Sequence, residues 1–190
     1  VGDAAVMLAH SAVVDLLLFS CTAGSFLEGA GYDREIIRHL EQLTGVRATT
    51  TSTCVQGAIQ ALGLRSLCVV TPYSAQVNDL ERQFLEGIGV EVTSMGGALL
   101  DRSQDTPKLT ASMMCSLVRE ADSPQAEGIF ISCTGLHVDT AIDPLEAELG
   151  KPVITSNQCG LWGCLRMLGI RDAIPGLGSL FRRNWKEGQS

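Results

Sequence analysis

Short apolar runs alternate with amphipathic patterns along the whole chain, and this alternation restricts the fold more than any other feature. The runs that read as strands are "VVDLLLFS" (13–20), "VRATTT" (46–51), "SLCVVT" (66–71), "VEVTSM" (90–95), "GIFISC" (128–133) and "KPVITS" (151–156). Most are apolar without polar alternation, as in strands covered on both faces. Segments 32–45, 74–89, 107–121 and 143–150 have helical spacing, and several end at Gly. The alternation predicts an α/β fold with a parallel sheet.

The two halves of the chain resemble each other. "LEQLTGVRATTTSTC", starting at Leu40, aligns with "LEAELGKPVITSNQC", starting at Leu145, and each stretch follows a strand that ends in Ser-Cys-Thr. Any two βα units look broadly alike, but here the polar residues at the strand ends also match. We therefore predict a duplicated unit, with residues 1–64 and 158–190 in the first half and residues 65–157 in the second.

The halves differ in length before their Ser-Cys-Thr strands. Counted from Arg65, the second half has far more residues before Cys133 than the first half has before Cys21. The difference corresponds to one strand-helix-strand unit, so the first half is expected to lack that unit at its N-terminal side.

Composition narrows the classes of partner. Hydrophobic residues make up 45% of the 190 residues, the net charge is −7, and the Lys and Arg residues are scattered, which argues against a nucleic-acid or membrane partner. The seven cysteines show no C-x-x-C pair, so no metal site is predicted. With no signal peptide or transmembrane run in the sequence, reduced cysteines favour a cytoplasmic location.

Small polar residues follow the predicted strands. They occur in "CTAGS", "TTTSTC", "TPYS", "SMGG", "CTGLH" and "TSNQC", without a Lys or Arg. Ligands of parallel sheets bind at the carboxyl ends of strands, where N–H groups and hydroxyls can hold an anion. A small carboxylate is the expected ligand. Helix capping is an equally good interpretation for single residues, and Ser52, Ser74 and Ser156 can be caps only.

Cys21 and Cys133 stand out among the thiols. Each lies just past a strand and before a helix, where N–H dipoles are expected to lower a thiol pKa. Two halves related by a pseudo-twofold axis would bring the two cysteines face to face across one cleft. The remaining cysteines are assigned structural roles: Cys54, Cys68, Cys115, Cys159 and Cys164.

The motifs "SCTAGSFLEGAGYD", "TGVRATTTSTCVQGAIQALG", "VVTPYSAQVNDLERQFLE", "IFISCTGL" and "LEAELGKPVITSNQ" resemble the aspartate/glutamate racemase superfamily. The similarity covers roughly residues 13–170 and is closest to the branch of maleate cis-trans isomerases and arylmalonate decarboxylases. It implies two flavodoxin-like (Rossmann-like) halves related by pseudo-twofold symmetry, with the site between them. It also implies a mechanism without a cofactor, and the segment that carries the family's substrate-binding Asn is not in this sequence.

The resemblance also assigns residues. It implies that Cys21 and Cys133 are the two catalytic thiols. The residues matched to substrate binding are Thr22, Tyr73, Thr134 and Asn157. The family's decarboxylases retain only the cysteine of the second half, so the presence of both favours isomerisation of a small unsaturated dicarboxylate, of the maleate-to-fumarate type. A two-thiol amino-acid or hydroxy-acid racemase and an arylmalonate-type decarboxylase are the alternatives, and a homo-oligomer, dimer or higher, is expected.

Two other classes of protein fit the sequence less well. A Cys133–His137 hydrolase places the histidine too close in sequence to the nucleophile and has no third orienting group. A two-lobed periplasmic binding protein conflicts with the unpaired cysteines and the lack of an export signal. The charged helix faces at 32–40 and 77–85 are expected to be solvated. The tail from Ser179 is expected to pack on the body of the protein or on a second subunit through Phe181 and Trp185.

Overall fold

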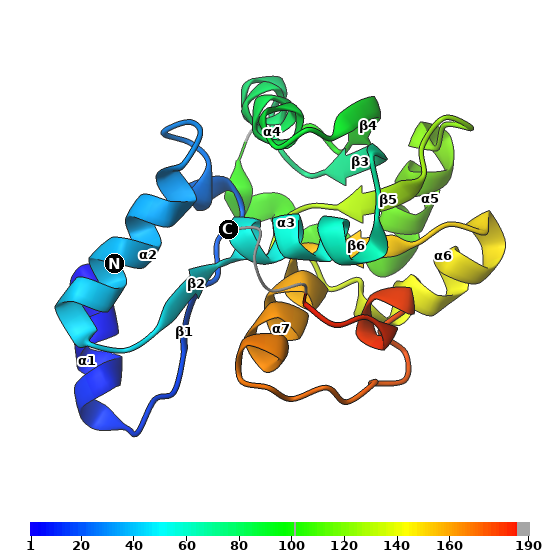
Figure 1. Cartoon of the computed structure of the whole chain (residues 1–190). Helices are drawn as coiled ribbons and strands as arrows, with labels where there is room; N and C mark the ends of the chain where they lie inside the picture. The colour runs from blue at the N-terminus through cyan, green and yellow to red at the C-terminus, as the bar shows by residue number, and fades with distance from the viewer. Residues whose placement is uncertain (101, 186–190) are drawn as a thin grey trace.

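The computed structural model describes residues 1–100 and 102–185 and contains two parallel sheets (Figure 1). The smaller sheet pairs β1 (Leu17–Phe19) with β2 (Ala48–Thr50). The larger sheet has the order β4-β3-β5-β6, formed by β3 (Ser66–Thr71), β4 (Glu91–Gly97), β5 (Gly128–Ile131) and β6 (Val153–Thr155). Each predicted strand is confirmed, and the α/β class with two parallel-sheet halves is confirmed with them.

Helices connect the strands. They are α1 (Gly2–Ser11), α2 (Tyr32–Thr44), α3 (Thr51–Leu62), α4 (Ala75–Gly87), α5 (Ala111–Ala121), α6 (Ile142–Leu149) and α7 (Ser156–Met167). The helix predicted over 107–121 is divided, because Pro107 lies in a 3-10 helix, Ser103–Lys108, and α5 begins after it. Thr110 caps α5 by accepting a hydrogen bond from the Met113 N–H at 3.2 Å.

The duplication is visible as a repeated set of hydrogen bonds. Glu41 Oε1 accepts the Ala48 N–H at 3.0 Å, and Glu146 Oε1 accepts the Val153 N–H at 3.1 Å. Each glutamate thereby ties the helix before the strand to the strand's first residue. In the described residues the first sheet has two strands and the second has four, as expected from the unequal halves. The division at residues 64/65 and 157/158 stays a prediction, and residues 101 and 186–190 lie outside the described chain.

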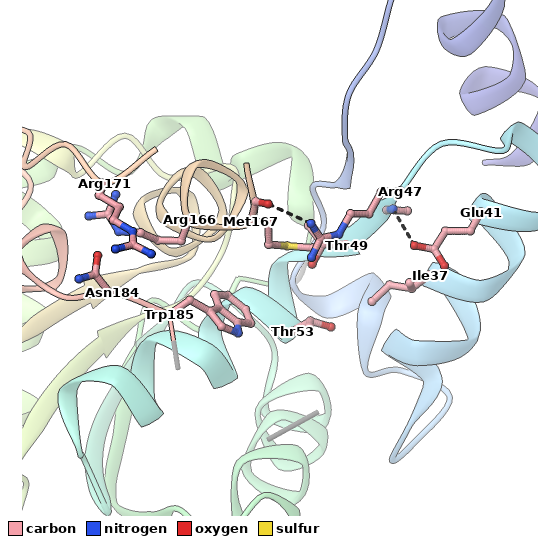
Figure 2. Close-up of a pocket in the computed structure, with 11 residues that line it drawn as sticks. Ile37, Glu41, Arg47, Thr49, Thr53, Arg166, Met167, Arg171, Asn184 and Trp185 are labelled. Atoms are coloured by element: carbon pink, nitrogen blue, oxygen red, sulfur yellow. Dashed lines mark hydrogen bonds between the residues drawn. The ribbon is translucent and has the colours of Figure 1, made fainter. Parts of the chain in front are cut away.

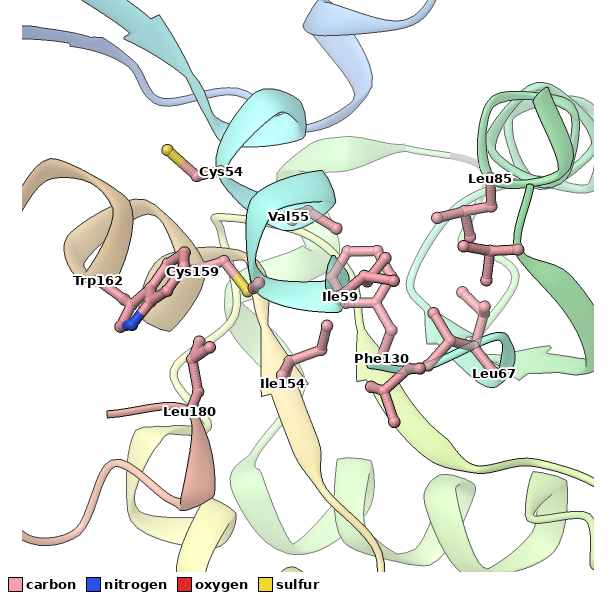
Figure 3. Close-up of a cluster of buried hydrophobic side chains, with 14 of the residues drawn as sticks. Cys54, Val55, Ile59, Leu67, Leu85, Phe130, Ile154, Cys159, Trp162 and Leu180 are labelled. Carbon is pink, nitrogen blue, oxygen red and sulfur yellow. The ribbon is translucent and has the colours of Figure 1, made fainter. Parts of the chain in front are cut away.

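Helix α3 follows the smaller sheet but packs across the larger one. Its apolar residues Val55 and Ile59 are buried against Leu67 of β3, Phe130 of β5 and Ile154 of β6 (Figure 3). Because it begins directly at the end of β2 and crosses the other sheet, α3 links the two halves through a hydrophobic core.

Helices α3 and α7 approach each other closely at a glycine. A Cβ atom on Gly163 of α7 would lie 2.5 Å from Cys54 Sγ of α3, closer than any real contact. Cys54 is fully buried, and burial raises the pKa of its thiol to about 12. This cysteine is therefore a small packing group, as the sequence predicted.

The C-terminal tail packs on the body of the protein. Phe181 is 1% exposed in the main core, and the ring of Trp185 stacks on Trp162 of α7 with centroids 5.2 Å apart. Trp162 also donates its indole N–H to the Arg183 carbonyl at 3.1 Å. The tail, described up to residue 185, thus packs on the body of the protein, one of the two arrangements expected from the sequence.

Replacing Gly163 with Ala should lower the free energy of unfolding by about 1 to 3 kcal/mol, because the added methyl group overlaps the Cys54 sulfur. Gly87→Ala is the matched control, since its Cβ would meet no atom within 4 Å, and it should leave stability unchanged or raise it slightly. Chemical denaturation of both variants measures the difference. The double variant Gly163→Ala/Cys54→Ala should recover part of the loss, and strictly additive losses would contradict this packing account.

Candidate active site

The two Ser-Cys-Thr segments occupy equivalent places in the fold. Cys21 lies two residues after β1, and Cys133 lies two residues after β5. The Gly24 N–H donates to Cys21 Sγ at 3.4 Å, and the Gly135 N–H donates to Cys133 Sγ at 3.3 Å. Each sulfur therefore sits in a turn that offers it a backbone N–H group.

A single buried hydroxyl joins these two segments. Ser156 Oγ, at the start of α7, accepts a hydrogen bond from Thr22 Oγ1 at 2.8 Å and another from the Cys133 N–H at 3.0 Å. Thr134 Oγ1 adds a longer bond of 3.4 Å to the Ser20 carbonyl. Thr22 and Thr134 thus hold the two cysteine segments together in this structure, while the face-to-face arrangement of the two thiols across one cleft stays a prediction.

Two further serines shape the Cys21 turn. Ser25 Oγ lies at hydrogen-bond distance from two carbonyl oxygens, 2.8 Å from that of Cys21 and 2.9 Å from that of Thr22. It also pairs with Ser52 Oγ at 2.8 Å. The sequence allows Ser52 and Ser156 to be helix caps, but Thr50 and Thr155 occupy the cap positions of α3 and α7. The capping interpretation is therefore wrong for Ser52 and Ser156, whose side chains instead bind the cysteine segments.

The two thiols have different surroundings. Cys21 is exposed, whereas Cys133 is half-buried and has a positive φ of 121°. Burial raises the pKa of the Cys133 thiol, and the Gly135 N–H and the Tyr73 phenol offset only part of that effect. The expected lowering of the pKa is thus wrong for Cys133, because desolvation outweighs the N–H group. Negative charge on Glu81 and on Cys21 raises the Cys133 pKa further.

Tyr73 and Asn157 both border Cys133. Burial raises the pKa of the Tyr73 phenol so that it stays neutral, and Ser132 and Cys133 are among the groups that act on that pKa. Asn157 Nδ2 donates to the carbonyls of Thr134 at 3.2 Å and Leu136 at 3.0 Å. The Asn157 amide therefore anchors the loop after Cys133, and substrate binding by both residues stays a prediction.

The competing nucleophile assignments have little support. The exposed His137 forms no hydrogen bond with Cys133 in the part of the chain described. Cys68 and Cys159 are fully buried, and burial raises the pKa of both thiols. These observations agree with structural roles for the buried cysteines.

Sequence reasoning missed Ser132 and Glu81. The Ser132 hydroxyl donates a short hydrogen bond to Glu81 Oε1, and both side chains are buried beside the Cys133 segment. The solvated-face interpretation is wrong for Glu81 of α4, which is 1% exposed, and for Asp33 of α2, which is 4% exposed. The repeated Ser-Cys-Thr motif could have pointed to Ser132. No sequence signal distinguishes Glu81 from its exposed neighbours.

A cavity of about 630 Å³ lies between α2, β2 and the end of α7, and none of the predicted site residues lines it (Figure 2). Two of its charged groups already hold backbone atoms: Glu41 binds the Ala48 N–H, and Arg47 Nη1 donates to the Met167 carbonyl at 2.9 Å. In the second half, the repeat counterpart of Glu41 is Glu146, which binds the Ser179 N–H at 2.8 Å. The C-terminal tail also lines this cavity, through Asn184 and Trp185, and none of the groups around it belongs to the predicted site.

Among residues 1–100 and 102–185, no cluster of three His, Cys, Asp or Glu side chains is arranged to hold a metal ion. Within the same residues, no helix has the length and apolar character needed to cross a bilayer.

Known proteins with similar sequence or structure fall into one group. Arylmalonate decarboxylase from Bordetella bronchiseptica is 33% identical over 175 residues, which cover 90% of this chain and 71% of that protein. A cysteine-to-alanine variant of maleate isomerase from Pseudomonas putida S16, solved with maleate, superposes with a TM-score of 0.92 at 22% identity, covering 97% and 76% of the two chains. A cysteine-to-serine variant of maleate cis-trans isomerase from Nocardia farcinica, with a covalently bound succinylcysteine intermediate, superposes with a TM-score of 0.91 at 17% sequence identity. The match covers 95% of this chain and 76% of that one.

The family assignment follows from the length of the match. The sequence model described as arylmalonate decarboxylase matches residues 1–181, which is nearly the whole chain. The members that it resembles are enzymes, both isomerases and decarboxylases. The chain belongs to the arylmalonate decarboxylase family, in the branch of the aspartate/glutamate racemase superfamily that also holds the maleate isomerases.

Proposed function

We propose that this protein is a cofactor-independent cis-trans isomerase of a small unsaturated dicarboxylate, of the maleate-to-fumarate type. The observation that carries the proposal is the pair of thiols at equivalent strand ends, whose two segments are joined by the Ser156 hydroxyl. A reaction at a carbon–carbon double bond needs a nucleophile and a proton donor within reach of adjacent carbons. Two cysteines in different surroundings can divide these roles.

The thiolate of Cys21 adds to one alkene carbon, forming a C–S bond while the π bond breaks. The adjacent carbon takes the proton from Cys133 Sγ, which becomes a thiolate. Rotation about the new C–C single bond then brings the carboxylates to the trans arrangement. Cys133 takes the proton back, the C–S bond breaks as the double bond re-forms, and Cys21 leaves as a thiolate. Atoms and charge balance, and neither an oxidant nor a cofactor is consumed.

The surroundings of the thiols support this division of roles. Cys21 is exposed and accepts the Gly24 N–H, so a substrate can reach its sulfur. Burial raises the pKa of Cys133, so this thiol keeps its proton at neutral pH and can donate it. Tyr73, at the same thiol, offers a neutral hydroxyl that can hold the newly formed thiolate.

Binding of the carboxylates can use backbone and hydroxyl donors. Helices α3 and α7 begin at Thr51 and Ser156, next to the two cysteine segments, and helix N-termini favour anions. The hydroxyls of Thr22 and Thr134 lie in the same segments. The solved relatives with maleate and with a succinylcysteine intermediate support a dicarboxylate and covalent cysteine chemistry.

Decarboxylation of an arylmalonate is the second candidate. The 33% identity to arylmalonate decarboxylase, higher than the 21% identity to maleate isomerase from Geobacillus stearothermophilus, is the observation that favours it. In that reaction one carboxylate leaves as carbon dioxide and Cys133 alone would protonate the resulting carbanion. Cys21 then has no required role, which separates the two candidates by experiment. A two-thiol racemase would instead need both cysteines for exchange at one carbon.

Proton NMR in deuterium oxide tests the reaction directly. With maleate, we expect the fumarate vinyl signal to grow, because the addition–elimination path returns an unsaturated acid. With a methyl-substituted arylmalonate, we expect no appearance of the monoacid. Monoacid formation without fumarate would replace the isomerase by the decarboxylase. Deuterium exchange into an amino or hydroxy acid, with maleate unchanged, would indicate the racemase.

Cys21→Ser and Cys133→Ser should each lower kcat by about 100-fold or more while keeping the fold, because a serine hydroxyl is a far weaker nucleophile and acid than a thiol. Cys115→Ser on α5 is the matched control, since this half-buried thiol is assigned a structural role. It should retain activity and lose only a little stability. Steady-state rates with maleate, alongside thermal unfolding, give the comparison. Full activity in Cys21→Ser would refute the two-thiol mechanism.

A further inference from the structure

Glu81 is a buried carboxyl group that the proposed mechanism does not use. It lies on α4 and is 1% exposed. Its Oε1 accepts the Ser132 hydroxyl, whereas its Oε2 has no hydrogen-bond partner among the described residues. A buried carboxyl without a full set of partners costs stability, so its place in the structure needs a reason.

The surroundings of Glu81 connect it to the candidate catalytic thiol. Ser132, which binds Glu81, directly precedes Cys133 and is fully buried. Glu81, Cys133 and Ser132 all act on the pKa of the Tyr73 phenol, which burial raises. The Cys133 backbone has a φ of 121°, and its N–H donates to Ser156 Oγ at 3.0 Å. Glu81 is thus connected to Cys133 through a single intervening residue, the fully buried Ser132.

We propose that Glu81 is a positioning residue for Cys133, which holds Ser132 in place and whose charge state controls the ionisation of the thiol. The role assigned to Cys133 rests on the proposed function. The contact between the Glu81 carboxyl group and Ser132 does not depend on the proposed function. It would act on Cys133 in the same way in a decarboxylase.

The sign of the coupling follows from burial. Desolvation raises the pKa of Glu81 to about 8, and the Ser132 hydrogen bond offsets only part of the rise. Below that pH the carboxyl is neutral, and above it the carboxylate raises the pKa of Cys133. Glu81 therefore opposes formation of the Cys133 thiolate only in the alkaline range, which helps the thiol to keep its proton.

The other ionisable groups near this pair are few. The groups that act on the thiol are Tyr73, Glu81 and Cys21, and no Lys or Arg among the described residues shifts the pKa of Glu81 or Cys133. Arg82, next to Glu81 in sequence, is directed elsewhere, since it donates to the Val92 carbonyl at 2.9 Å and pairs with Glu86 at 3.7 Å. Nothing in the described chain therefore neutralises the Glu81 carboxylate.

Alkylation of Cys133 by iodoacetamide tests the inference without turnover. The initial rate for the Cys133 peptide is followed by mass spectrometry from about pH 6 to about pH 10, in the wild type and in Glu81→Gln. Gln keeps an acceptor for Ser132 but carries no charge. The rates should coincide where Glu81 is neutral, and above about pH 8 the variant should react about threefold to tenfold faster. Repeating the series in a Cys21→Ser background removes the second thiolate from the comparison.

Glu86→Gln is the matched control, because Glu86 lies on the same helix with an exposed side chain and undergoes the same chemical change. It should leave the Cys133 rate unchanged at every pH. Glu81→Leu, which removes charge and acceptor together at similar volume, should show the same alkaline increase and provides a second variant if the Gln protein does not fold.

A rate ratio that is constant across the pH range would overturn the inference, because a purely structural role changes reactivity without reference to the charge of Glu81. Identical rates at all pH values would overturn it as well. If the alkaline increase is present and maleate is not isomerised, the coupling stands and the proposed function fails. The two hypotheses are therefore tested separately.

Discussion

The close packing of α3 on α7 is the contact on which the rest of the structure depends. Each helix begins at the end of a short strand, and the two meet where Gly163 leaves room for the Cys54 sulfur. Because α3 lies on the larger sheet, this contact fixes the smaller sheet relative to the larger one. The N-termini of both helices are then held beside the two cysteine segments, and Ser156 can reach across to both.

Most of the fold was accessible from the sequence because strands buried on both faces leave a simple apolar signal. The strands at 66–71 and 128–131 are examples, since β3 and β5 are buried throughout. Boundaries were less accessible: β2 is short because Thr50 already caps α3, and α5 starts late because Pro107 belongs to a separate turn. Helix α1 was not predicted, since its pattern is only weakly amphipathic and a single residue, Ala5, is buried.

The candidate site was accessible in part, for a different reason. Duplication marks Cys21 and Cys133, because the same three residues recur at equivalent strand ends. The residues that contact the cysteine segments or act on the Cys133 pKa are not marked by any repeat in the sequence. Ser156 resembles any serine near a helix start, and Glu81 resembles the charged residues beside it. Their roles arise from which face of a helix is covered by a distant element, and one sequence does not carry that information.

The same hydroxyl that joins the two cysteine segments has a consequence for motion. With Ser156 bonded to both halves and no space between α3 and α7 at Gly163, a hinge movement of one half against the other would break buried contacts. A ligand would then have to enter and leave through movement of the outer loops. The exposed stretch 27–31 after Cys21, with left-handed glycines at 29 and 31, can change shape without disturbing the core. Changes of shape are then expected in the loop beside one thiol, on a framework that stays in place.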